Sequence, residues 1–122
     1  MEIIAVAKKI EEKIKTLELG RSLLQERAEE KAKAIAIYEK EIAKTLIGLK
    51  NGTEFDIDGE KIKDPPASIM EKLARGICYQ AKIDSELAEA TYKNAVVGMN
   101  AIEAELMGWQ SIFRNLSHET EG

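Results

Sequence analysis

Two long stretches of the chain repeat their apolar residues with helical spacing, and a short proline-containing break separates them. Residues 2–50 lack proline, and most positions reached from Ile3 to Leu49 by alternating steps of four and three residues are apolar. This heptad spacing predicts an amphipathic helix with a seam for other helices. A second apolar track beside the seam widens the apolar face, which favours a bundle of three or four helices.

Residues 65–116 predict a second helical arm. The Asp64-Pro65-Pro66 sequence suits a helix start, because proline lacks only an N–H group that the first turn does not use. The apolar track includes positions eleven residues apart, from Leu73 to Leu106, and this spacing favours a nearly straight helix. Small side chains occupy the middle of this arm and would allow another helix to approach closely. We expect the closest helix–helix contact there, in an interface between subunits formed by Ala95, Gly98 and Ile102.

Residues 51–64 predict a turn and a small β-hairpin. Apolar and polar residues alternate from Phe55 to Ile62, and Asp58-Gly59 is a typical two-residue hairpin turn. An isolated two-stranded ribbon is only marginally stable in water. We therefore expect Phe55 and Ile57 to pack onto helix ends or onto another subunit.

The predicted fold is mainly all-α: a single domain over residues 1–122, with arms at 2–50 and 65–116 and a polar tail at 117–122. The arms form a long antiparallel two-helix hairpin with the β-hairpin at the connection. We expect Ile10 to face Leu106, a register that also pairs Lys31 with Asp84. These two are polar residues at seam positions of the two arms, so the register predicts an ion pair in the seam.

Two helical arms alone bury too little apolar surface. Fixing the backbone costs about 1–2 kcal/mol per residue, and a single stripe between two helices recovers only part of that cost. The sequence therefore predicts that other copies of the chain complete the core, as an oligomeric helical bundle.

Composition excludes several classes of function. The formal net charge is −4 at pH 7, which gives no support to binding of duplex nucleic acid, since that requires Lys and Arg to neutralise phosphates. No apolar run reaches the ~20 residues needed to span a membrane. The single cysteine, Cys78, cannot form an internal disulfide, which suits a reducing cytoplasm, and its helical context predicts a packed structural thiol.

No catalytic constellation is evident, so we expect no enzymatic activity, no cofactor and no metal. The only histidine, His118, lies in the predicted tail. Cationic and aromatic side chains do cluster on the second arm, where a ring beside Arg or Lys could stack on a base and bind a phosphate. The candidate ligand-binding residues are Arg75, Tyr79, Lys82, Trp109 and Arg114. The alternative interpretation is that the rings are core and the cations are solvated.

Short motifs add a resemblance. The segments FDIDGEKI (55–62), DPPA (64–67) and LMGWQSI (106–112) resemble small helical proteins of tailed-phage early regions, over the second half of the chain. The resemblance implies a phage-encoded accessory protein that acts in a bacterial cytoplasm. It carries no functional residue to this chain. Small phage proteins without catalytic residues resemble, in role, inhibitors of host defence.

Two classes of function follow. In the first, a non-enzymatic homo-oligomer antagonises a bacterial defence, either by sequestering a nucleotide second messenger or by blocking a host defence protein. The blocking surface would be acidic, with Glu86, Glu89, Glu103 and Glu105 as candidates. In the second, the bundle is an architectural or recombination and replication accessory that bridges other phage proteins.

Overall fold

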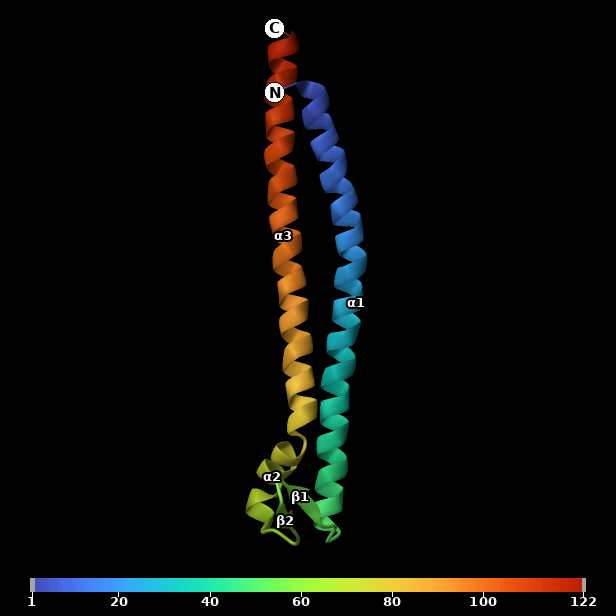
Figure 1. The fold of residues 1–122 in the computed structure, drawn as a ribbon, viewed down its shortest axis with the longest axis vertical. Helices are drawn as coiled ribbons and strands as arrows, with labels where there is room; N and C mark the ends of the chain where they lie inside the picture. The colour runs from blue at the N-terminus through green and yellow to red at the C-terminus, as the bar shows by residue number, and fades with distance from the viewer. Residues whose placement is uncertain (1, 122) are drawn as a thin grey trace. The chain divides into compact units, whose positions relative to one another are not determined.

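The computed structural model describes residues 2–121, and most of them are helical (Figure 1). The elements are helix α1 (Ile3–Lys50), strands β1 (Phe55–Ile57) and β2 (Glu60–Ile62), the 3-10 turn η1 (Ala67–Ile69), and helices α2 (Met70–Ile77) and α3 (Tyr79–Glu121). The predicted class is confirmed: two long helical arms run antiparallel and are joined through a small β-hairpin. The polar tail expected after Leu116 is wrong, because α3 continues to Glu121.

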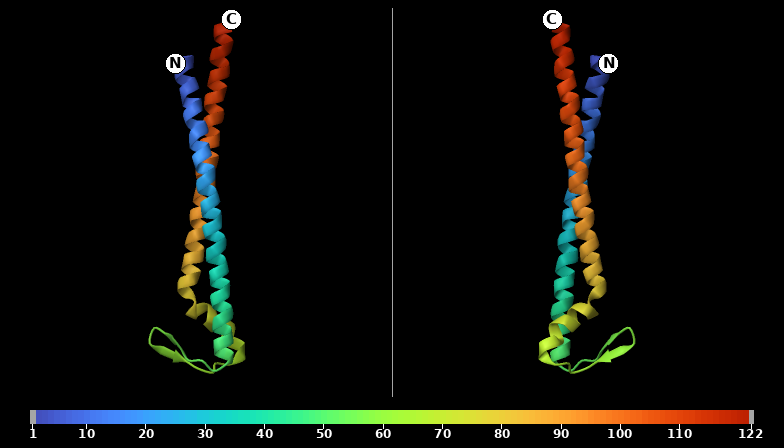
Figure 2. Two further views of the ribbon diagram at one scale, coloured as in Figure 1. Left: turned by 90° about the vertical axis from the view of Figure 1, so that its right-hand side faces the viewer. Right: turned by 90° about the vertical axis from the view of Figure 1, so that its left-hand side faces the viewer.

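Contacts within the chain form two compact units, and each unit contains a part of both long helices. Unit 1 comprises Met1–Ala28 and Thr91–Gly122, and unit 2 is Glu29–Ala90. In each unit a segment of α1 lies antiparallel to a segment of α3 (Figure 2). Unit 2 also holds both strands and α2, which lie beside the C-terminal end of α1 (Figure 1).

The β-hairpin forms at the predicted turn. Strands β1 and β2 are antiparallel, with Phe55 paired to Ile62. Asp58 and Gly59 have φ angles of 49° and 88°, so both central residues adopt the left-handed conformation that a two-residue hairpin turn requires. The Gly59 N–H group donates a 2.8 Å hydrogen bond to the Asp56 carboxylate, which further fixes the turn.

The hairpin is held by helix ends, which confirms one of the two expected packing modes. A Cβ atom placed on Gly48 would lie 2.8 Å from Phe55 Cζ, so the ring packs directly on the last turn of α1. Ile57 Cδ1 lies 3.9 Å from the equivalent position on Gly76 of α2. The hairpin therefore uses two glycines as docking surfaces and gains apolar contacts that a free ribbon lacks.

The second arm is interrupted, and the expected uninterrupted helix over 65–116 is wrong. Cys78 separates α2 from α3, with φ −88° and ψ 23°, well away from helical ψ. Its N–H group still donates to the Ala74 carbonyl, and its own carbonyl accepts from the Lys82 N–H. The Cys78 thiol lies 3.3 Å from the Thr45 hydroxyl of α1, in a buried hydrogen bond. The break thus occurs where α2 leaves the axis of α3 to pack on the hairpin.

The register of the two arms differs from the expected one. The predicted register places Lys13 opposite Glu103, but in unit 1 Lys13 forms an ion pair with Glu105, two residues further along α3. The same register places Tyr38 opposite Cys78, but in unit 2 the residue over the Tyr38 ring is Lys82, four residues further along the chain. Asp84 accepts a 3.1 Å hydrogen bond from Gln80 on its own helix. The seam pair of Lys31 with Asp84 stays a prediction.

At Gly20, a side chain of α3 packs closely against the backbone of α1 in unit 1. The Met99 sulfur occupies the space that a Cβ atom on Gly20 would need, and Met99 is buried. We expected the closest helix contact at Gly98. In the described part of the chain, however, no atom lies within 4 Å of a Cβ position on Gly98. The role of Gly98 between subunits stays a prediction.

The core is thin. Among residues 2–119, seven apolar residues are buried: Val6, Leu17, Tyr38, Leu49, Ala74, Cys78 and Met99. Thirteen large apolar side chains in the same range are 41% to 75% exposed. The accessible surface is 8737 Å², against about 6,600 Å² expected for a folded chain of 13.6 kDa. Much of the apolar surface therefore has no cover within the chain.

Replacing Gly48 by alanine should destabilise the chain, because the new Cβ atom would collide with the rigid Phe55 ring. We expect a loss of about 1–3 kcal/mol in the free energy of unfolding, measured by urea denaturation. Gly108→Ala is the matched control, since a Cβ atom there meets nothing within 4 Å. It should gain about 0.5–1 kcal/mol from helix propensity. Equal effects of the two changes would contradict the proposed packing of Phe55.

The Cys78 thiol should react slowly with a thiol reagent, because only 7% of the residue is exposed and the thiol is hydrogen-bonded to the Thr45 hydroxyl. We expect labelling of the native chain to be at least about tenfold slower than labelling in urea, since it requires local opening. A cysteine introduced at exposed Ser111, in a Cys78→Ser background, should react at once. Similar native rates at both positions would show that the α2–α3 break is open.

Candidate functional site

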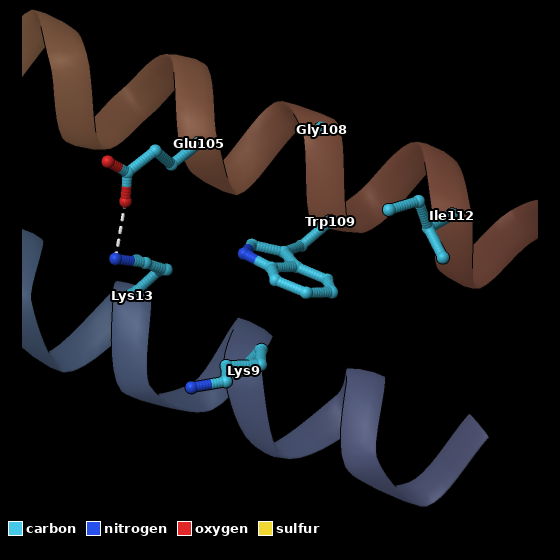
Figure 3. A pocket seen from close by; sticks show the side chains of 6 residues that line it. All are labelled: Lys9, Lys13, Glu105, Gly108, Trp109 and Ile112. Carbon is cyan, nitrogen blue, oxygen red and sulfur yellow. Dashed lines mark ion pairs between the residues drawn. The ribbon is translucent and has the colours of Figure 1, made fainter. Parts of the chain in front are cut away.

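The largest hollow we describe lies in unit 1 beside the single tryptophan. It has a volume of about 420 Å³ and is lined by Lys9 and Lys13 of α1 and by Glu105, Gly108, Trp109 and Ile112 of α3. We call it the Trp109 hollow. Figure 3 shows the indole ring extending from α3 toward α1, where the two lysines lie. A flat ring beside two cations is an arrangement that can bind an aromatic anion.

Both lysines of the Trp109 hollow have acidic partners. Lys13 forms an ion pair with Glu105 across the hollow, and Lys9 Nζ lies 3.5 Å from Glu12 one turn along α1. Ion pairs as exposed as these contribute little to stability, because water screens them. They do, however, offset the positive charge, so an anionic ligand would have to compete with Glu12 and Glu105.

A second hollow in unit 1 is almost entirely apolar. It has a volume of about 270 Å³, and its lining residues are Gly20, Leu23, Asn94, Ala95, Gly98, Met99 and Ile102. We call it the Gly98 groove. The structure thus brings the three residues expected at an oligomer interface to one surface. Asn94 provides the only polar side chain among the lining residues.

In unit 2, two of the predicted ligand-binding cations surround a tyrosine. Lys82 Nζ lies 5.4 Å from the centroid of the Tyr38 ring, a cation–π distance. Lys82 also forms a 2.9 Å ion pair with Glu86, and Arg75 forms one of 2.9 Å with Glu71. Each cation is therefore matched by a glutamate one turn away on its own helix.

These partners affect the titration of both cations. The hydrogen bond and charge of Glu86 raise the pKa of Lys82 above its ordinary value, and Glu71, followed by Tyr38, raises the pKa of Arg75. Since the folded chain holds Lys82 more firmly protonated, its stabilising contribution is present below the ordinary pKa. That contribution is lost as the pH rises through the raised pKa. Both groups stay charged at neutral pH.

The predicted ligand-binding residues do not form one site. Arg75 and Lys82 meet at Tyr38, while Tyr79 is 57% exposed and Arg114 is not among the residues that line the Trp109 hollow. Sequence reasoning missed Lys9 and Lys13 as neighbours of Trp109. The heptad spacing of the first arm contained the signal for Lys13, because it places this residue beside the seam, whereas Lys9 falls on the outer face of that pattern.

The thiol of Cys78 lies at a third hollow, of about 330 Å³, in unit 2. Thr45, Glu41 and Asp84 also line it, but the only hydrogen bond described for the thiol is with Thr45. His118 is exposed on α3. Among residues 2–121, no group of three or more His, Cys, Asp or Glu side chains is arranged to hold a metal ion.

None of the described helices has an apolar stretch long enough to cross a bilayer. Comparisons of the chain with protein-family models, with curated proteins and with solved structures found no match. The candidate sites are therefore defined by the geometry of this chain alone.

Proposed function

We propose that this protein is a non-enzymatic homo-oligomer that serves as an architectural accessory, in which several copies form a helical bundle that binds other proteins. The observation that carries the proposal is the exposure of thirteen large apolar side chains, against seven apolar residues that are buried, within residues 2–119. Exposed apolar surface on this scale marks interaction sites.

The surface area supports self-association as the first step. The accessible surface of 8737 Å² exceeds the expectation for a chain of this mass by about 2,100 Å². A standard interface removes about 800 Å² per partner, so two or three such interfaces would account for the excess. Self-association requires no other molecule, so we take a second copy of the chain as the first partner to test.

The charges favour protein binding over capture of a small anion as the general role. Lys13, Arg75 and Lys82 each form an ion pair with a glutamate. The acidic surface considered for blocking a defence protein is partly neutralised in the same way, because Glu86 and Glu105 are two of those partners. A balanced surface with apolar stripes suits helix–helix assembly.

Self-association predicts that mass and stability both depend on concentration. We expect light scattering to give a multiple of 13.6 kDa at micromolar concentration, and the Tm to rise with protein concentration, since association stabilises the folded state by mass action. A mass of one chain across the whole range, with a constant Tm, would overturn the proposal.

A second candidate function is favoured by the Trp109 hollow. Its volume of about 420 Å³ lies within the ordinary range for small-molecule sites, and it combines an aromatic ring with two lysines. We propose as the alternative that the protein sequesters a nucleotide second messenger here and so antagonises a bacterial defence. The base would stack on Trp109, and a phosphate would replace Glu105 as the partner of Lys13.

Because Trp109 is the only tryptophan, its fluorescence reports directly on this hollow. A cyclic nucleotide that binds should quench the emission, and Lys13→Gln should weaken binding about tenfold, the effect expected for one charged hydrogen bond. Lys40→Gln, at an exposed position in unit 2, is the matched control and should bind normally. Absence of quenching and of calorimetric heat at about 1 mM nucleotide would remove this candidate.

A further inference from the structure

We infer that the Gly98 groove of unit 1 is the surface on which a second copy of this chain docks, with α3 of one copy lying antiparallel against α3 of the other about a twofold axis near Gly98. The inference rests on the proposed self-association and specifies its interface. The groove is lined by α1 and α3 of one unit, and its floor is the Gly20–Met99 contact.

The groove has the form that receives a helix. Its residues on α3 continue at alternating steps of three and four through Ala95, Gly98 and Ile102, the spacing of a coiled-coil seam. Leu23 forms part of the α1 wall and is 43% exposed, and Leu19 beside it is 75% exposed. On α3, Ala95, Met99 and Ile102 supply the apolar side chains of the other wall. A helix laid in this groove would therefore contact apolar side chains from both walls.

The absence of a side chain at Gly98 permits a close approach. A Cβ atom on Gly98 would meet nothing within 4 Å among the described residues, so no part of the described chain fills this space. Gly20 differs, since the Met99 side chain fills its space. Two backbones that cross at Gly98 could come nearer than two helices with ordinary side chains, and their apolar neighbours would interdigitate.

A second copy fits the groove better than other ligands because the surface is self-complementary. The seam positions from Thr91 to Ile102 on α3 carry no charge, so two copies can face each other without burying an unpaired ion. A nucleotide or an acidic peptide would find no cation among the lining residues. A twofold axis uses the same patch twice, and antiparallel helices also oppose their dipoles.

The area that an interface needs is present. A stable homodimer removes about 800 Å² or more from each partner, and the surface excess of this chain is about 2,100 Å². Of the exposed large apolar residues of unit 1, Leu23 lines the groove and Leu19 lies one turn from it on α1, so both can contribute to that area.

The Gly98→Leu variant should weaken dimerisation without destabilising the folded chain. The chain has room for the new side chain and leucine favours helix, so the variant should fold at least as well as the wild type. In the dimer it would hold the two backbones apart, and we expect the dissociation constant to rise at least about 100-fold, measured by sedimentation. Ala104→Leu, a comparable enlargement at an exposed alanine that lies about 120° around α3 from Gly98 and does not line the groove, should assemble like the wild type.

A disulfide test locates the axis independently. In a Cys78→Ser background, a cysteine at Gly98 should form a disulfide-linked dimer on mild oxidation, because residues at a twofold axis bring their Cα atoms within bonding range. A cysteine at Ala104 should remain unlinked. If the wild type assembles but Gly98→Leu assembles equally and Gly98→Cys does not link, the inference is wrong while the proposed function stands. A wild-type monomer would overturn both.

Discussion

The structure depends on how little apolar surface two antiparallel helices can hide from water. Each helix of such a pair presents one stripe to its partner, and side chains beside that stripe remain exposed whatever their chemistry. In unit 1 the buried apolar residues are Val6, Leu17 and Met99, while Leu19 and Val97 stay largely in solvent. Hydrophobic burial is the dominant favourable term in folding, so this constraint limits the stability that the helical pair of unit 1 gains from its own packing.

In unit 2, elements close in the sequence cover part of the apolar surface that the two long helices leave exposed. The hairpin and α2 cover the end of α1, where Leu49 is buried and Phe55 packs against Gly48. Covering that end requires α2 to leave the line of α3, and the chain turns at Cys78. The polar groups buried near the turn are satisfied, since the Thr45 hydroxyl and the Cys78 thiol bond to each other. The break thus serves packing, with its polar cost offset by one hydrogen bond.

The sequence predicted what local periodicity and turn chemistry decide. Heptad spacing placed α1, and Asp58-Gly59 placed the hairpin, because these signals act over a few residues. The break at Cys78 escaped prediction because the apolar spacing runs through it. The register was not predicted because a shift of two to four residues still pairs mostly apolar or small residues along the seam. Ala95, Gly98 and Ile102 line one groove because helical spacing alone places them together, whereas the neighbours of Tyr38 and Trp109 depend on register.

Gly20 and Gly98 show how one residue type can have two uses in one helical pair. A glycine inside a helix costs about 1 kcal/mol relative to alanine, and a close packing contact at the glycine can offset that cost. At Gly20 the gain is within the chain, because Met99 is buried in the space that a side chain would occupy. At Gly98 no described atom takes that space, yet the residue lies in an apolar groove that exposed Leu23 also lines. The missing gain at Gly98 is what a docked helix would supply, and a second copy brings a helix of matching character.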